Sequence, residues 1–166
     1  MDGPSEPAPS PGTGYGTALY DDVAHTLALD ANFTGLAGNT TASHIHAATP
    51  NPFMQTAGVA TTTPSFAGFP LGVTSGTFSN TLDLTLSSSW NASYITANGG
   101  TTAGAEAAFS AALFANKAYW NIHSSANPSG DIRGFLTLVP EPASGALLAF
   151  GLVGLAAIAR RHRQSP

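Results

Sequence analysis

Apolar and polar residues alternate along two long stretches of this chain, and no other sequence feature constrains its fold so strongly. Neighbouring side chains of a β-strand point to opposite faces, so this alternation predicts strands with one buried and one solvated face. His25–Phe33 and Gly76–Leu86 both show the pattern. Their apolar positions are Leu27, Leu29, Ala31 and Phe33 in the first stretch, and Phe78, Leu82, Leu84 and Leu86 in the second.

Turn-forming residues divide the rest of the body into shorter segments. One helix is predicted from Ala103 to about Asn116, with Thr101 or Thr102 as its N-cap. About seven short strands around one core predict an all-β fold with one short helix. We expect an antiparallel Greek-key sandwich, either immunoglobulin-like or superoxide-dismutase-like. The further strands are predicted at Thr17–Tyr20, Ala42–Ala47, Ala57–Thr61, Ala118–Ser124 and Ile132–Leu138.

Charged side chains are scarce, and their distribution argues against one class of partner. They make up 8% of the 166 residues, against roughly 25% in an average soluble domain. The nine acids all lie at or before Glu141, whereas the body offers only Lys117 and Arg133 as cations. Because such a body lacks a basic surface for phosphates, nucleic acid is not an expected partner. The chain has no cysteine, which excludes disulfides and thiolate metal ligands.

The C-terminal region carries an uncharged apolar segment, Ala143–Ala159. As a helix it would be about 25 Å long, near the lower limit for crossing a hydrocarbon core of ~30 Å. Arg160, Arg161 and Arg163 follow at once, and their charge favours a cytoplasmic location for that end. The sequence therefore predicts a C-terminal transmembrane helix with the body outside the cytoplasm. A buried core helix is the alternative, and it fits a terminal arginine cluster less well.

Val139, Pro140, Glu141 and Pro142 stand directly before the apolar segment. The two prolines keep this tetrapeptide extended and outside the helix. Together with the apolar segment and the basic end, it resembles the three-part PEP-CTERM signal of Gram-negative bacteria, here over residues 139–166. The resemblance implies that an exosortase, a membrane protease, recognises Pro-Glu-Pro and removes the helix. The body is then delivered to the envelope or the exopolysaccharide.

The body, residues 14–138, resembles the CHRD domain. Residues 1–13 form a Pro/Gly-rich lead-in in which Glu6-Pro-Ala-Pro follows only five residues, where family members usually carry an additional strand. We therefore expect a signal peptide and a first strand to lie upstream of Met1. The resemblance rests on Phe33-Thr-Gly-Leu-Ala-Gly, Ala42-Ser-His-Ile-His, Gly76-Thr-Phe, Ala118-Tyr-Trp-Asn-Ile-His and Asn127-Pro-Ser-Gly-Asp-Ile-Arg-Gly.

Three histidines are candidate metal ligands. His44 and His46 occupy positions i and i+2 of a predicted strand, so their side chains share a face and lie roughly 6.5–7 Å apart along it. His123 lies on the face of its strand opposite Trp120 and Ile122, which is not an obvious core position. Three neutral imidazoles suit Cu(II) or Zn(II). The alternative interpretation is a hydrogen-bonded polar surface.

The order of these histidines is similar to that in copper/zinc superoxide dismutases. There a His-x-His strand is followed by a strand that ends in His and by a Gly-rich stretch with an active-site Arg, and Gly130-Asp-Ile-Arg133 takes the last place in that order. The long zinc loop, the bridging histidine and the disulfide cysteines have no counterpart. Arg133 could guide an anion to the metal or form an ion pair with Asp131 or Asp83. Asn121 could orient the imidazole two residues further on.

The serines and acids of the body form no pattern typical of a hydrolase. The sequence therefore predicts a non-enzymatic exported β-sandwich that acts as a binding or structural component. The expected partners are an exosortase, the membrane through residues 143–159, and exopolysaccharide or matrix proteins. The competing hypothesis is a copper or zinc metalloprotein with its site at His44, His46 and His123, and the similarity to superoxide dismutases implies redox activity for it.

Overall fold

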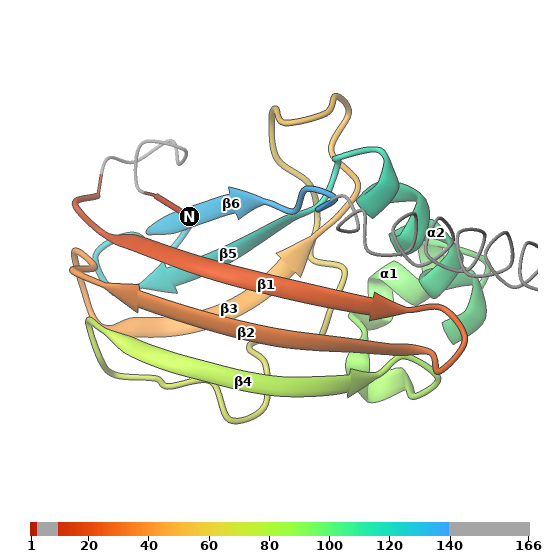
Figure 1. Ribbon diagram of the computed structural model, residues 1–166, viewed down its shortest axis with the longest axis horizontal. Coiled ribbons are helices and arrows are strands. Elements are labelled where there is room, and N and C mark those ends of the chain that lie inside the picture. Colours follow the sequence, from red (N-terminus) through yellow and green to blue (C-terminus); the bar gives the residue numbers. More distant parts are fainter. Residues whose placement is uncertain (3–9, 140–166) are drawn as a thin grey trace, which may run out of the picture.

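The computed structural model describes residues 1–2 and 10–139, and within them the chain forms two antiparallel three-stranded sheets (Figure 1). One sheet has the strand order β1-β2-β4 and the other β3-β5-β6. The prediction of a mostly β, antiparallel fold is confirmed. The strands are β1 Thr13–Asp21, β2 Thr26–Thr34, β3 Thr40–His46, β4 Gly76–Asp83, β5 Tyr119–Ser124 and β6 Ile132–Phe135.

The core lies between the two sheets and follows from the alternation. Leu27 and Leu29 of β2 are fully buried, as are Ile45 of β3 and Ile122 of β5. Rings from the two sheets meet edge to face, with the centroids of Phe78 and Trp120 6.2 Å apart. Burying one face of each sheet in this way is the main contribution to the stability of a sandwich.

Leu86 is an exception to the predicted alternation, since it is 52% exposed. Strand β4 ends at Asp83, whose carboxylate accepts hydrogen bonds from the backbone N–H and the hydroxyl of Thr85. This turn takes the chain off the sheet before Leu86 can face the core.

The prediction of a seventh strand at Ala57–Thr61 is wrong. This stretch follows the edge of β3 but makes only isolated bridges, Val59 with His46 and Thr61 with Trp90. A side chain takes the place of a backbone partner here, because Thr61 Oγ1 accepts a hydrogen bond from the backbone N–H of Ile45 at 2.9 Å. A side-chain acceptor at this point interrupts the regular backbone pairing that a strand requires.

Two α-helices lie together at one end of the sheets (Figure 1). The predicted helix is α2, Thr102–Phe114, and the side chain of Thr101 caps it by accepting from Gly104 N. The second helix, α1 (Ala92–Ala97), was not predicted. Its N-cap is Asn91, whose side chain accepts from Ser93 N, and its β-branched interior gives only a weak helix signal.

Of the sorting tetrapeptide, only Val139 is among the described residues. Pro140–Pro142, the predicted transmembrane segment 143–159 and the arginines that follow it lie outside them. Within the described part of the chain, no helix is long and apolar enough to cross a bilayer. The transmembrane helix therefore stays a prediction from the sequence.

Candidate metal centre

Strands β3 and β5 place the three histidines on one face of their sheet. In the antiparallel register His44 lies opposite Asn121, His46 opposite Tyr119 and Ala42 opposite His123. Because directly paired residues point to the same side, both His-x-His imidazoles and that of His123 share the face turned away from Ile45 and the core. Short segments cover this face, and the exposed fractions of His44, His46 and His123 are 7%, 8% and 8%.

The three rings converge on one another. The Nε2 atoms of His44 and His123 are 2.9 Å apart. The ring centroid of His44 lies 4.7 Å from that of His46 and 4.6 Å from that of His123. One nitrogen of each histidine lies within 4.8 Å of the other two. The structure therefore brings together all three residues that the sequence singled out.

A backbone carbonyl holds the outer nitrogen of each ring. His44 Nδ1 is 3.0 Å from Pro64 O, His46 Nδ1 is 2.8 Å from Ala57 O, and His123 Nδ1 is 2.9 Å from Pro128 O. A carbonyl oxygen only accepts, so each Nδ1 must carry the proton and donate it. In a neutral ring this leaves each Nε2 as a bare lone pair.

Burial keeps the rings neutral. Desolvation, aided by the neighbouring imidazoles, lowers the pKa of His44 to about 4. Desolvation lowers the pKa of His46 to about 4 as well, and the charges of His123 and Arg133 act in the same direction. The pKa of His123 is also lowered by burial. No proton is therefore available at neutral pH to bridge the Nε2 atoms of His44 and His123.

Two lone pairs that face each other at 2.9 Å repel, and a cation between them would remove the repulsion. His46 Nε2 is buried and has no hydrogen-bond partner among the described residues. A buried acceptor without a partner is destabilising. The same ion would satisfy all three nitrogens, so the donor set fits a metal.

The spacing is close to that of a metal site. At a metal–nitrogen distance of about 2.0–2.1 Å, a nitrogen separation of 2.9 Å subtends about 90° at the ion. Ligands of one ion can be at most about 4 Å apart, so nitrogens spread over 4.8 Å must close by roughly 1 Å on binding.

Tyr119 and Arg133 flank the centre. The Tyr119 ring stacks on that of His46 with centroids 4.6 Å apart, and the guanidinium of Arg133 lies 5.0 Å from the centre of the Tyr119 ring. Arg133 Nη1 also donates to Gln55 O at 3.1 Å. Of the two ion-pair partners expected from the sequence, Asp131 accepts hydrogen bonds from the hydroxyls of Ser10 and Ser124. Asp83 accepts from Thr85.

Asn121 does not make the contact expected of it. The Nδ1 of His123 is held by Pro128 O, while Asn121 Nδ2 donates to Ser129 O at 3.4 Å. Asn121 is 2% exposed, and its Oδ1 has no hydrogen-bond partner within the described part of the chain.

Comparison with known families identifies the body and the tail. A family model of the CHRD domain matches residues 1–136, and a model of the PEP-CTERM protein-sorting motif matches residues 138–164. This chain belongs to the CHRD family. No curated protein and no solved structure matches it. The resemblances to the CHRD domain and to the PEP-CTERM signal are thereby confirmed. The sorting motif makes this CHRD protein an exported, envelope-targeted protein whose sorting depends on an exosortase.

The carbonyls that orient the imidazoles could not be predicted from the sequence of the CHRD body. Any residue presents a carbonyl, so Ala57, Pro64 and Pro128 give no signal of their own. A further histidine, His25, makes its contact elsewhere, since its Nδ1 lies 3.0 Å from the carboxylate of Glu106 in α2.

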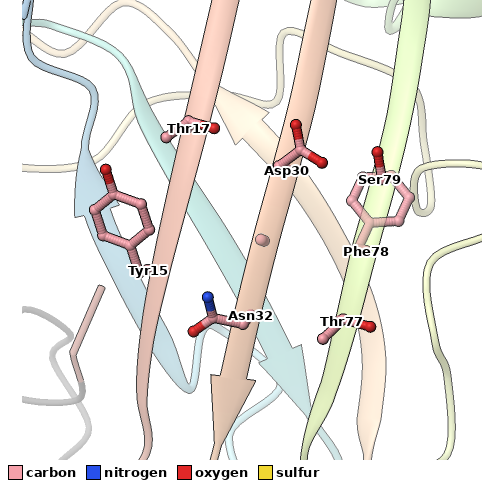
Figure 2. A pocket seen from close by; sticks show the side chains of 8 residues that line it. Tyr15, Thr17, Asp30, Asn32, Thr77, Phe78 and Ser79 are labelled. Atoms are coloured by element: carbon pink, nitrogen blue, oxygen red, sulfur yellow. The ribbon is translucent and has the colours of Figure 1, made fainter.

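A second concave surface of the CHRD body lies on the other sheet. A hollow of about 390 Å³ lies on the outer face of β1, β2 and β4. Figure 2 shows the side chains that line it. It offers hydroxyl, amide and carboxylate groups but no imidazole. Its lining includes Tyr15, Thr17, Asp30, Asn32, Thr77 and Ser79. The three-histidine cluster is therefore the better candidate for a metal centre.

Proposed function

We propose that this CHRD protein binds a divalent transition metal, Cu(II) or Zn(II), in the bacterial envelope through His44, His46 and His123. One observation carries the proposal. Three buried imidazoles each bring one nitrogen within 4.8 Å of the other two, and the Nε2 atoms of His44 and His123 are 2.9 Å apart. A backbone carbonyl on each Nδ1 is the usual outer-shell arrangement of a metal-binding histidine.

The donor set selects the class of metal. Imidazole nitrogens suit copper and zinc, whereas calcium and magnesium require oxygen ligands and favour carboxylates. The segments that supply the orienting carbonyls, residues 47–66 and 125–130, contain no Asp or Glu. Copper(II) ranks above zinc in affinity for nitrogen sites, so copper is the first ion to test.

The tail gives the route to the envelope. In this proposal the apolar segment 143–159 spans the inner membrane once, and the exosortase then cuts near Pro-Glu-Pro and releases the body toward the exopolysaccharide or matrix. Outside the cytoplasm the metal would join β3 to β5 through the three histidines. The body would then serve as a metal-stabilised binding or structural module.

Metal analysis of the full chain in detergent tests the proposal. We expect one equivalent of copper or zinc per chain after dialysis, and a rise in the melting temperature when metal is added. His46→Ala should abolish both, because two imidazoles bind far more weakly than three. His25→Ala is the matched control, since His25 lies against Glu106 and should retain full metal content. Sub-stoichiometric metal in the unmodified chain, or an unchanged metal-induced shift in His46→Ala, would contradict the proposal.

A further inference from the structure

Asn121 is a buried polar residue next to the three histidines, and the proposed metal site gives its side-chain oxygen no role. It is almost completely buried, and its Oδ1 has no hydrogen-bond partner among the residues described. Buried amide oxygens in folded proteins are nearly always hydrogen-bonded, to water where no protein donor is near. An acceptor in this position can take a hydrogen bond from a water or ligand bound at the centre.

The amide has one favoured orientation. Its Nδ2 faces Ser129 O at 3.4 Å, so exchanging the two ends would set the amide oxygen against another acceptor. The Oδ1 is therefore directed away from the turn that contains Ser129. Asn121 pairs with His44 across the ladder and lies two residues before His123, so it shares their face and is a neighbour of both.

Three imidazoles do not complete the coordination of either metal. Zinc binds four ligands, and copper(II) binds four or more. The described residues add no fourth His, Cys, Asp or Glu to the cluster. With three protein ligands, the remaining position of such a site is taken by water. A water molecule on a divalent ion is a strong hydrogen-bond donor, because the ion withdraws charge from its O–H bonds.

The geometry points to a metal-bound water whose proton is accepted by Asn121 Oδ1, at a coordination position that stays open to small anions. This inference rests on the proposed metal site and adds to it the nature of the fourth ligand. Asn121 acts as a positioning residue, since it contacts the water rather than the metal. The ligands that can replace the water are small anions, and those without a donor lose the hydrogen bond to Oδ1.

The test uses the full chain in detergent, loaded with one equivalent of Cu(II). Pulsed electron paramagnetic resonance in D₂O should detect an exchangeable deuteron on a copper-bound oxygen. Azide, which has no proton to donate, should replace the water and produce a charge-transfer absorption band. In Asn121→Ala the water loses its acceptor, so the azide dissociation constant should fall by roughly fivefold, the size of one net hydrogen bond.

Two further substitutions of Asn121 test the role of its Oδ1. Asn121→Asp keeps an acceptor in the same place and adds a negative charge, so it should hold the copper-bound water more tightly and raise the azide dissociation constant. Asn121→Ser serves if the alanine variant fails to fold. Asn32→Ala is the matched control, because Asn32 lies exposed on β2 and belongs to the other sheet. It should leave the azide dissociation constant unchanged.

The outcomes separate the two proposals. If the unmodified chain retains copper but shows neither an exchangeable deuteron nor an azide band, the centre is closed and this inference is overturned while metal binding stands. An azide constant within twofold of the unmodified value in Asn121→Ala and Asn121→Ser overturns the role of Oδ1. If the unmodified chain retains no copper, the metal site itself fails and the inference fails with it.

Discussion

The direction of each imidazole at the centre is set by the main chain rather than by another side chain. Pro64, Ala57 and Pro128 each offer a carbonyl to one Nδ1. This arrangement fixes the tautomer of each ring as well as its orientation. The carbonyl oxygen only accepts hydrogen bonds, so the Nδ1 that faces it must carry the proton. The Nε2 atoms are thereby left unprotonated and able to bind a cation. Burial adds the second condition, since it keeps protons from competing for those atoms.

The metal-free protein should lose stability as the pH falls from about 6.5 to about 4. His44 and His46 have a pKa near 4 when folded and 6.5 when unfolded. Between these values only the unfolded chain takes up protons, so the free energy of unfolding is highest above pH 6.5 and falls with the pH through this window. Two such shifts correspond to a loss on the order of a few kcal/mol.

Urea unfolding at several pH values in the presence of a chelator measures this loss. Replacing both residues, His44→Gln with His46→Gln, should flatten the profile between pH 6.5 and 4, whereas His25→Gln should not. The lowered pKa values of Asp21 and Asp83 act at lower pH, since their stabilising effect is lost only below the ordinary carboxylate range. A slope that persists unchanged in the double variant would rule out these histidines as its cause.

At the scale of elements, the alternating pattern predicted the strands whose two faces differ most. Strand β2 (Thr26–Thr34) has fully buried leucines on one face and exposed polar residues on the other, so its pattern is unambiguous. Strand β1 begins at Thr13, four residues before the predicted start. Gly14 and Gly16 hide the alternation there, and a side chain at Gly16 would approach the Trp120 ring to 3.2 Å.

The candidate site was predicted only as far as local geometry allows. That His44 and His46 share a face follows from their spacing of two residues. That His123 joins them depends on the β3–β5 register, which brings His44 and His123 together although they are 79 positions apart in sequence. Such register is determined by the packing of the whole sheet and by its turns, and no single segment encodes it. The open amide oxygen of Asn121 depends on the same register.

The carboxylate of Asp131 holds the turn at residues 125–130 that orients His123. Asp131 is fully buried and accepts hydrogen bonds from the Ser10 and Ser124 hydroxyls and from the backbone N–H of Ala37. Asp131→Ala leaves these donors without an acceptor, so the free energy of unfolding should fall by about 2–4 kcal/mol. The metal affinity should fall as well, because the 125–130 turn supplies the Pro128 carbonyl.

Chemical denaturation and a metal titration measure the two effects of Asp131→Ala separately. Asp30→Ala is the matched control, as Asp30 lies exposed on β2 and its loss should change the free energy of unfolding by less than about 0.5 kcal/mol. Equal effects of the two substitutions would show that the buried network does not hold the turn.

In the whole molecule, the hydrophobic core and the candidate metal centre lie on opposite faces of the β3-β5-β6 sheet. The core between the sheets is apolar and complete without the histidines, with Leu29, Phe109 and Trp120 almost wholly buried in it. The centre lies on the opposite face of the β3-β5-β6 sheet. A metal bound there would add to the stability of a domain that already has a core, rather than replace one. We therefore expect the domain to fold without metal.

Processing of the tail is the prediction that concerns the whole chain. In a host that has the cognate exosortase, the mature protein should lack residues 143–166 and leave the membrane fraction, because Pro-Glu-Pro is cut and the apolar segment is removed. Glu141→Ala should block recognition, so that the full-length chain stays in the membrane. Glu6→Ala is the matched control, since Glu6 also precedes a proline but lies in the N-terminal lead-in. Intact-mass spectrometry of each fraction reads the result directly. Residues beyond Pro142 still attached to the mature, unmodified protein would instead identify the tail as a permanent anchor.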